Sequence, residues 1–228
     1  MPHALNSKPL FKDRDAAAEA LREAIPSTLF DLSGCIVVGI GAGGIYIADK
    51  ISRAFGIEMD MLLTEPIKAP NNPELVVAIV SETEDLVMNR ALVEAFEIDE
   101  DYLYSEANRK YEEAILASLY RYRKGIPMRS LEGRQVILVD EAIETGLTMS
   151  VAIKSIIEKR AKSIYVAVPL LDQTLYGAIE NLCDGLFSPN RIRDYISIEY
   201  YYEKLDELDF ESVEKILELQ GVTRIKEH

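Results

Sequence analysis

Short apolar runs alternate with longer segments of helical periodicity along this chain. Val and Ile dominate the runs with little polar alternation, which is typical of strands covered on both faces. The runs are Cys35–Ile40, Ile57–Leu63, Leu75–Val80, Val136–Val139 and Ile164–Val168. Strands that alternate with helices form βαβ units, so the sequence predicts an α/β protein built on a parallel sheet.

Apolar residues spaced three and four apart predict amphipathic helices between these runs. Two such stripes are Ala17, Ala20, Leu21, Ala24 and Ile25, and Met149, Ala152, Ile153, Ile156 and Ile157. Asp13 or Asp15 is the expected N-cap of the first helix, because an aspartate side chain can accept from free backbone N–H groups. We also expect a long helix from about Asp99 to Lys124 and a final helix near Phe210–Leu219.

Composition narrows the class of protein. The 228 residues are 48% apolar and no Gly/Ser/Pro linker divides them, so we expect a single domain over residues 1–228. A net charge of −14 argues against general nucleic-acid binding. The chain has no run long enough to span a membrane and no signal-peptide pattern at its start, which predicts a cytoplasmic protein without membrane contact.

Few residues are suited to a metal site or a disulfide. The two cysteines, Cys35 and Cys183, are far apart in the sequence, and we expect both to be buried as small apolar side chains. The histidines are His3 and His228, at the two ends of the sequence. The sequence therefore predicts neither a disulfide framework nor a protein-built metal site.

The most informative stretch covers residues 136–149, where a hydrophobic strand ends in Asp140–Glu141 and a short polar loop opens a helix. Backbone N–H groups at a helix start can bind a phosphate, Thr145 and Thr148 can add hydroxyl donors, and Gly146 allows close approach. The carboxylates can accept hydrogen bonds from sugar hydroxyls. Phosphate beside ribose is the predicted ligand; an ordinary strand–turn–helix is the alternative.

This stretch resembles the phosphoribosyl-pyrophosphate (PRPP) motif of type I phosphoribosyltransferases, in which two acids precede a loop that ends Thr-Gly-x-Thr. The resemblance implies a Rossmann-like parallel sheet with a small hood, and Asp140 and Glu141 on the ribose 2′- and 3′-hydroxyls. It also implies that the following loop holds the 5′-phosphate. The loop residues are Ile143, Glu144, Thr145, Gly146, Leu147 and Thr148. Softer likenesses to a bacterial group of this family lie at Phe11–Arg14, Ala69–Leu75 and Tyr200–Glu203.

Glu144 has two interpretations. The 6-oxopurine phosphoribosyltransferases carry an Asp general base at this position, and by that resemblance Glu144 is the candidate catalytic base. The alternative, which we weigh more heavily, is an acid that stabilises the first turn of a helix.

A glycine-rich segment follows the first strand. By the resemblance, Gly41, Ala42, Gly43 and Gly44 form the pyrophosphate loop. Gly39, Gly41 and Gly44 also fit a dinucleotide-binding G-x-G-x-x-G pattern with Glu65 further on, but that interpretation leaves residues 140–148 unexplained. Two departures stand out: relatives carry Arg or Lys at the position of Ala42, and an Arg-Lys pair where this chain has Glu65–Pro66.

The resemblance places a hood over the acceptor, for which we expect the N-terminal helix and about 187–205. Tyr200–Tyr202 could stack on a planar base, but core or surface packing is the alternative that we weigh more heavily for each of them. Arg191 and Arg193 could meet an anionic acceptor or a phosphate. The predicted function is transfer of the phosphoribosyl group of PRPP, with Mg²⁺, to an unknown small nitrogenous acceptor. The alternative is a catalytically impaired PRPP- or nucleotide-binding regulatory protein. A homodimer is left open.

Overall fold

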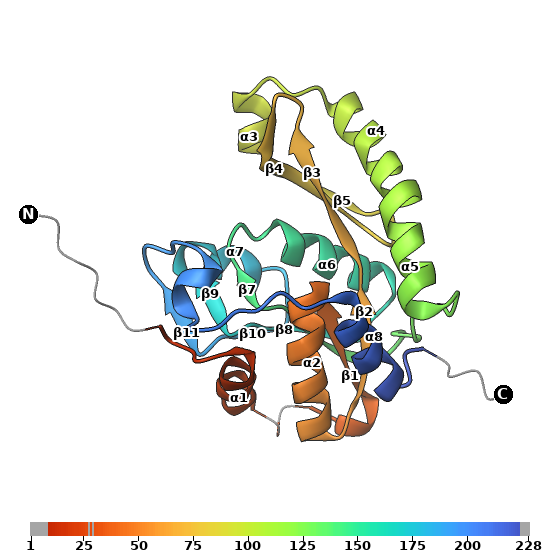
Figure 1. The fold of residues 1–228 in the computed structure, drawn as a ribbon, viewed down its shortest axis with the longest axis vertical. Helices are drawn as coiled ribbons and strands as arrows, with labels where there is room; N and C mark the ends of the chain where they lie inside the picture. Colours follow the sequence, from red (N-terminus) through yellow and green to blue (C-terminus); the bar gives the residue numbers. More distant parts are fainter. Residues whose placement is uncertain (1–8, 27, 29, 224–228) are drawn as a thin grey trace, which may run out of the picture.

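A five-stranded parallel sheet forms the centre of the protein, in the order β10-β8-β6-β1-β2 (Figure 1). The structure, a computed structural model, describes residues 9–26, 28 and 30–223, so His3 and His228 lie outside the described residues. The strands are β1 (Cys35–Ile40), β2 (Glu58–Leu62), β6 (Gln135–Val139), β8 (Ser163–Ala167) and β10 (Gly185–Phe187). β1 lies at the centre, where Val38 pairs with Asp60 on one side and with Leu138 on the other.

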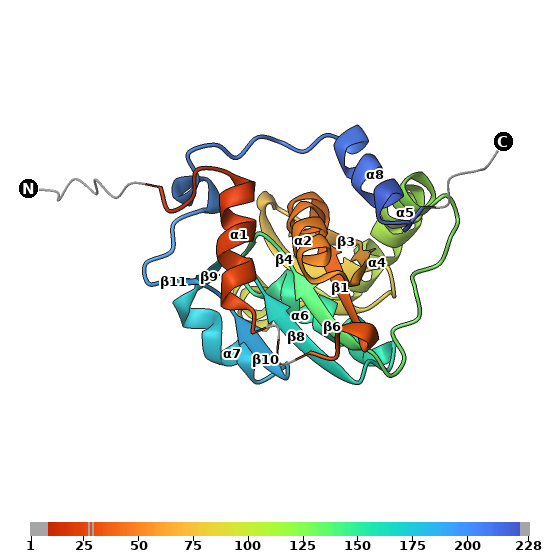
Figure 2. The same cartoon turned by 90° about the horizontal axis from the view of Figure 1, so that it is seen from below.

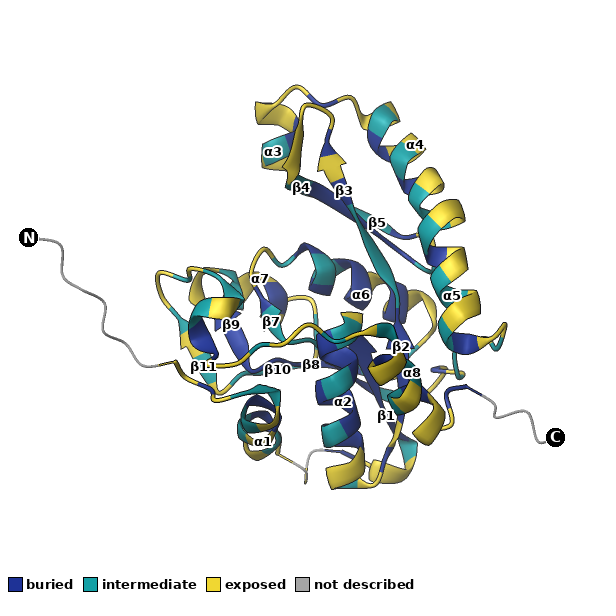
Figure 3. Cartoon of the chain, viewed as in Figure 1, coloured by how far each residue is buried: buried dark blue, intermediate teal, exposed yellow. Residues whose placement is uncertain are grey.

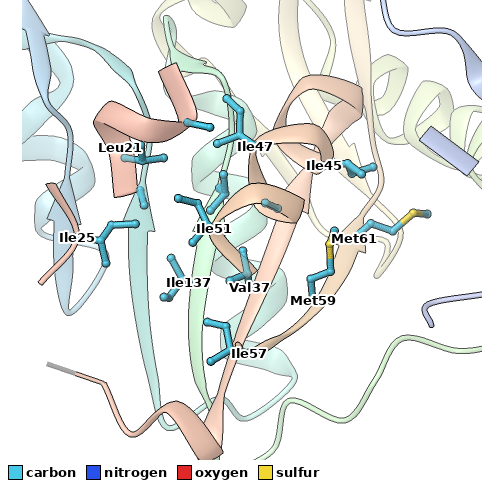
Figure 4. Close-up of a cluster of buried hydrophobic side chains, with 14 of the residues drawn as sticks. Leu21, Ile25, Val37, Ile45, Ile47, Ile51, Ile57, Met59, Met61 and Ile137 are labelled. Carbon is cyan, nitrogen blue, oxygen red and sulfur yellow. The ribbon is translucent and has the colours of Figure 1, made fainter. Parts of the chain in front are cut away.

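Helices cover both faces of this sheet (Figure 2). α1 (Arg14–Ala24), α2 (Gly41–Phe55) and α8 (Phe210–Leu219) pack on one face, and α6 (Leu147–Glu158) and α7 (Tyr176–Glu180) on the other. Alternate side chains of each strand enter the two layers: Val37 joins the α2 side and Val38 the α6 side. Figure 4 shows Ile47 and Ile51 of α2 over Val37. The predicted α/β class and the doubly covered strands are confirmed.

Residues 64–123 form a separate projection, which we call the arm (Figure 1). It contains an antiparallel sheet of β3 (Thr64–Ala69), β4 (Asn72–Ser81) and β5 (Leu86–Met88). The helical part comprises α3 (Arg90–Ala95), α4 (Glu100–Lys110), a π-helical turn (Tyr111–Ile115) and α5 (Leu116–Arg123). Leu103, Ala107 and Ile115 are buried on the helical face toward the sheet, whereas the outer face is largely exposed (Figure 3).

The arm corrects one prediction from the sequence. The run Leu75–Val80 lies in β4, which is antiparallel to both of its neighbours, and is not part of the central parallel sheet. The run is apolar because Val77, Ala78 and Val80 are buried under the arm helices, and Ile79 packs against α6. A strand buried on both faces has the same apolar sequence in either kind of sheet.

A buried ionic cluster fastens the end of the arm to the central sheet. Arg123 is 2% exposed and donates to Glu82 Oε1 at 2.7 Å, while its other terminal nitrogen lies 3.3 Å from Asp60 Oδ1. The same nitrogen donates to the carbonyl oxygen of Met61. Since these partners follow β4 or belong to β2, the cluster fixes where the arm leaves the sheet.

Hydroxyl groups fasten the arm to α6 as well. Ser81, Thr83 and Ser155 lie 2.7–2.8 Å from one another through their side-chain oxygens, and Thr83 also donates to Asp85 at 2.6 Å. Ser155 belongs to α6, and the other three residues follow or end β4. The arm is thus tied directly to the helix that begins at the predicted phosphate loop.

A second parallel sheet, β7 (Ala142–Ile143), β9 (Leu170–Asp172) and β11 (Asn190–Ile192), extends the carboxyl edge of the central one. Short 3₁₀ turns occupy Leu32–Gly34, Gln173–Leu175 and Ile198–Tyr201. Phe11 forms a parallel bridge with Tyr202, which brings the segment before α1 against residues 201–204. The two segments predicted to form the hood are therefore neighbours; their role over an acceptor stays a prediction.

Several local predictions are confirmed. Asp13 caps α1 by accepting from Ala16 N at 2.9 Å, and Phe210–Leu219 is helical. Cys35 is buried as predicted, whereas Cys183 is only half-buried. Ile157 is the exception in its stripe, since it is 59% exposed on α6. In the described part of the chain, no helix combines the length and apolar character needed to cross a membrane.

Candidate functional site

A cavity of about 430 Å³ lies at the carboxyl end of β6. Residues 140–146, Thr148 and Met149 line it at the start of α6. The arm contributes Thr64, Pro66, Val76 and Ile79 to the lining, and Ile198 completes it. The edge where parallel strands end is the usual ligand-binding edge of such sheets. All of the predicted phosphate-loop residues except Leu147 line this one cavity.

The turn from β6 into α6 has the geometry that an anion site requires. Gly146 takes φ of +77°, a left-handed conformation that suits glycine, and serves as the N-cap of α6. Thr145 Oγ1 accepts weakly from Leu147 N at 3.4 Å, and no side chain caps the helix. The backbone N–H groups of the first turn have no partner within the helix. Ile143 and Leu147 are 2% and 7% exposed, so they offer backbone and not side chains to a ligand.

Asp140 is the more deeply placed of the two acids. It is half-buried, and its Oδ1 accepts from the backbone N–H of Glu141 at 2.7 Å. Burial, foremost, raises the pKa of the Asp140 carboxyl to about 8, and the charges of Glu141 and Glu144 add to the rise. The backbone hydrogen bond opposes this shift. Because its ionised form is disfavoured, the Asp140 carboxylate should be stabilised strongly by a ligand that donates hydrogen bonds to it.

Glu141 is held by a residue distant in the sequence. Arg14 Nε forms an ion pair with Glu141 Oε1, and the two side chains are only 13% and 18% exposed. Arg14 also donates through Nη1 to the carbonyl oxygen of Asp206. Sequence reasoning identifies Phe11–Arg14 only as a likeness and gives Arg14 no role. The single available signal is an arginine directly after the N-cap of the first helix.

Gly41–Gly44 form the first turn of α2, so the loop predicted there is helical. Gly41 enters the helix with φ of +65°. A β-carbon on Gly43 would overlap the carboxylate of Glu141, and one on Gly44 would lie 2.7 Å from the carbonyl oxygen of Val139. The glycines therefore let α2 pack directly on the end of β6, which brings the two predicted binding segments into contact. Their role toward a diphosphate stays a prediction.

Comparison with known proteins agrees with this geometry. The sequence model of the family described as "Phosphoribosyl transferase domain" matches residues 9–204. The chain belongs to the phosphoribosyl transferase domain family. The match spans the acid pair, the α6 loop, the α2 glycines and Arg14, together with both segments of the predicted hood. Because it also covers the arm, the whole of the site described above lies inside the family domain.

Relatives of this phosphoribosyl transferase domain are found among curated and solved proteins. "Putative phosphoribosyl transferase Rv0571c" and "Putative phosphoribosyl transferase MT0597", from two strains of Mycobacterium tuberculosis, are each 28% identical over 163 residues, which is 71% of this chain. The chain spans about a third of the length of these relatives, 36% in each case. The crystal structure of TT1426 from Thermus thermophilus is 27% identical, with 94% of this chain and 99% of that chain covered and a TM-score of 0.73.

Glu144 of this phosphoribosyl transferase domain is exposed on the rim of the cavity. Its Oε1 accepts from the backbone N–H of Ile198 at 3.0 Å, which draws the predicted hood segment toward the α6 loop. Burial, and then the nearby Glu144 carboxylate, raise the pKa of the Tyr195 hydroxyl. The carboxylate thus faces both the cavity and the hood segment. Its use as a base stays a prediction.

Two of the tyrosines at 200–202 are packed against other rings, which agrees with the packing interpretation and not with stacking on a base. Tyr202 tilts on Phe11 with ring centroids 5.3 Å apart, and Tyr201 lies 5.2 Å from the Tyr195 ring. Tyr201 and Tyr202 are 6% and 5% exposed, so neither offers a face to a planar ligand. Arg191 is exposed and stacks on the ring of Tyr176, outside the residues that line the cavity.

Proposed function

We propose that this protein binds Mg²⁺·PRPP in the cavity at the end of β6 and transfers its phosphoribosyl group to a small nitrogenous acceptor. The observation that carries the proposal is that Asp140–Glu141 and the N-terminal turn of α6 line the same cavity. The 5′-phosphate and the ribose hydroxyls of PRPP are separated by only a few bonds. The N–H donors of the α6 turn suit the phosphate, and the two carboxylate acceptors suit the hydroxyls. Family membership supports the same reaction class.

Each group has a distinct part in the proposed reaction. The N–H groups of the first turn of α6, with Thr145 and Thr148, would hold the 5′-phosphate. Asp140 and Glu141 would accept hydrogen bonds from the ribose hydroxyls, which fixes C1′ relative to the acceptor. Glu144, at the rim, would be the base that takes a proton from the acceptor nitrogen. Val76, Ile79 and Pro66 of the arm supply an apolar wall that limits water around C1′.

Magnesium fits this site as part of the substrate. The described residues contain no group of three or more His, Cys, Asp or Glu side chains that could hold a metal by themselves. Mg²⁺ commonly binds through one or two carboxylates together with substrate phosphates, and Asp140 is the candidate carboxylate here, because Glu141 is held in an ion pair with Arg14. When bound, it would supply neutralisation of the negative charge on the leaving diphosphate.

A second candidate is a protein that binds PRPP or a nucleotide without turnover and acts as a regulator. It is favoured by the charge of the cavity, because its lining residues, all within the described part of the chain, include three acids and neither Lys nor Arg. Ala42, where relatives carry a cation, packs half-buried against the main core cluster. Under either function we expect the protein to act in the cytoplasm.

Calorimetric titration with Mg²⁺ and PRPP tests the binding site. Thr145→Glu places a carboxylate in the phosphate cradle and should abolish binding through like-charge repulsion. Cys183→Ala, in a half-buried side chain away from the cavity, is the matched control and should bind as the wild type does. Equal affinity of the Thr145 variant and the wild type would reject the site.

Turnover separates the two functions. The wild-type protein with PRPP is offered a panel of nitrogenous bases, and released pyrophosphate is measured. Release with one base, abolished by Thr145→Glu, establishes the transferase. Binding of PRPP without release for any base favours the regulator.

A further inference from the structure

The described lining of the cavity leaves one electrostatic problem, which is the source of positive charge for a diphosphate. No Lys or Arg lines it, and the side chain of Ala42 is turned into the core cluster with Ile45 and Ile47 of the same helix. A protein cation that acts beside the Mg²⁺ of the substrate would have to come from another element. Arg14, at the start of α1, is the candidate because it reaches Glu141 at the edge of this cavity.

Glu141 bridges Arg14 and the first turn of α2. Its Oε1 pairs with the guanidinium of Arg14, and its Oε2 lies so close to Gly43 that a β-carbon there would overlap it. The guanidinium is therefore about one carboxylate group away from the backbone of the α2 turn. A carboxylate already sits where an anionic ligand could meet both the helix start and an arginine.

Tyr202 provides a second, independent observation at this place. Its hydroxyl is buried in a residue that is 5% exposed, and it has no hydrogen-bond partner among the described residues. Burial raises its pKa, the charges of Glu141 and Asp140 raise it further, and the charge of Arg14 opposes them. The Tyr202 ring also tilts on Phe11, three residues before Arg14, with ring centroids 5.3 Å apart, so Tyr202 lies beside the segment that carries Arg14. A buried hydroxyl of this kind needs a hydrogen-bond partner, which a ligand or an ordered water supplies.

We propose that the Arg14 guanidinium binds the diphosphate of Mg²⁺·PRPP, or free pyrophosphate, beside the N-terminal turn of α2, in competition with the carboxylate of Glu141. This inference rests on the proposed function and adds a binding residue to it. Arginine presents planar paired donors that match phosphate as well as carboxylate. Tyr202 supplies a further donor to the same anion, and Glu141, once released, is free to accept from the ribose hydroxyls.

The backbone around Arg14 holds it ready for this exchange. Phe11 N donates to Tyr201 O at 3.0 Å, and Lys204 N donates to Lys12 O at 3.0 Å. The backbone just before α1 is therefore hydrogen-bonded to the segment that carries Tyr202. Arg14 also borders a smaller cavity of about 200 Å³ with Lys204 and Asp206. Arg14 therefore borders a cavity that Glu141 does not line.

Competition makes the signs of two substitutions opposite. Arg14→Gln removes the cation and should weaken binding of Mg²⁺·pyrophosphate by about tenfold or more, as expected for a charge-assisted phosphate contact. Glu141→Gln removes the competing carboxylate charge and should strengthen binding of the same probe several-fold. If Arg14 only served to hold Glu141, neither substitution would change pyrophosphate affinity in these opposite directions.

The test is calorimetric titration of the full chain with Mg²⁺·pyrophosphate. The matched control is Arg22→Gln, which removes an exposed arginine of α1 that pairs with Glu19 and should stay within about twofold of wild type. Tyr202→Phe, which deletes one oxygen and carries little risk to folding, should weaken binding several-fold. Circular dichroism and thermal unfolding check each variant; if Arg14→Gln does not fold, the gain in Glu141→Gln and the loss in Tyr202→Phe decide.

The outcomes separate this inference from the function on which it rests. If the wild-type protein binds neither PRPP nor pyrophosphate, the proposed function fails and the role of Arg14 fails with it. If the wild type binds both and Arg14→Gln binds equally well, only the role of Arg14 is overturned. Equal weakening by Arg14→Gln and Glu141→Gln would likewise overturn it, because the pair would then act as a structural unit.

Discussion

Lys110 Nζ lies 3.2 Å from Glu65 Oε2, which joins α4 to β3 on the side of the arm away from the cavity. Thr64 and Pro66, the neighbours of Glu65, line the cavity. Because successive side chains of a strand point to opposite faces, Glu65 faces the helix and its charge is matched there. Relatives are expected to carry an Arg-Lys pair where this chain has Glu65–Pro66, and the geometry directs the charge of Glu65 toward Lys110 on α4.

Glu65→Gln is therefore expected to leave the affinity for Mg²⁺·PRPP within about twofold of wild type, and to lower the free energy of unfolding by less than about 1 kcal/mol, as for other partly exposed pairs. Calorimetry and urea denaturation measure the two quantities. A large gain in PRPP affinity would mean that the Glu65 charge reaches the ligand after all.

The raised pKa of Asp140 predicts a pH-dependent stability. The folded state holds the proton up to about pH 8, whereas the unfolded state releases it near 3.8. Ionisation in the folded state is therefore unfavourable, and the Asp140 contribution lowers the free energy of unfolding progressively as pH rises through this window. Asp140→Asn removes the contribution, so its stability relative to wild type should increase from about pH 4 to about pH 8 and be constant above. Denaturation curves across this range provide the measurement.

PRPP binding should favour the ionised form of Asp140, whereas folding favours its protonated form. Ribose hydroxyls donate to the ionised carboxylate, so PRPP affinity should increase as pH rises toward about 8, with proton release on binding below that pH. Titrations in buffers of different ionisation enthalpy count the protons released. Asp140→Asn supplies the control, and the same proton release in that variant would assign it to the ligand or to another residue.

Gly43 and Gly44 should respond differently to alanine. At Gly43 the new β-carbon meets the end of the Glu141 side chain, which can move, so we expect nearly unchanged stability with the Arg14–Glu141 pair displaced. At Gly44 it meets the backbone oxygen of Val139 at 2.7 Å, which cannot move without separating α2 from β6. Gly44→Ala should cost about 1–3 kcal/mol, as other overpacked cores do. Urea denaturation of both variants compares them; equal stability would show that the contact at Gly44 relaxes easily.

Arg123→Ala should be among the most damaging single changes in the arm. It leaves the buried carboxylates of Glu82 and Asp60 without their cation, which typically costs about 3–5 kcal/mol. The matched control is Arg160→Ala, since Arg160 is 80% exposed in its pair with Glu132 and should change stability by less than about 1 kcal/mol. Chemical denaturation of the two variants should give clearly different midpoints; similar midpoints would show that the buried cluster is dispensable.

The fold was predictable where local pattern and long-range structure agree. The strand at residues 136–139 and the helix after Gly146 follow directly from periodicity and turn chemistry, because both depend on neighbouring residues. The sheet to which Leu75–Val80 belongs could not be predicted, because the direction of strand pairing is set by partners elsewhere in the chain. The glycine pattern at 41–44 predicted a loop after the first strand, because it could not distinguish a loop from the first turn of a helix.

The candidate site shows the same division. Thr145, Gly146 and Thr148 could be assigned from a short motif, and they line the cavity together with Asp140 and Glu141. Arg14 could not be assigned to the site, because nothing near it in the sequence indicates a partner 127 residues away. Its position depends on how α1 packs on α2 and on the pairing of Phe11 with Tyr202, which are properties of the finished fold.

The contacts of Arg14 also set an order of events during synthesis of the chain. Its two partners, Glu141 and the carbonyl oxygen of Asp206, are 127 and 192 residues further along. The ribosome therefore delivers β1, the α2 glycines and the acid pair well before the segment around Asp206 that completes the setting of Arg14. A nascent chain released at about residue 190 would have the central sheet and the phosphate turn, but its Arg14 would lack the carbonyl contact and the paired Tyr201–Lys204 backbone. The proposed contact of Arg14 with a diphosphate should thus be completed late, after most of the core can already form.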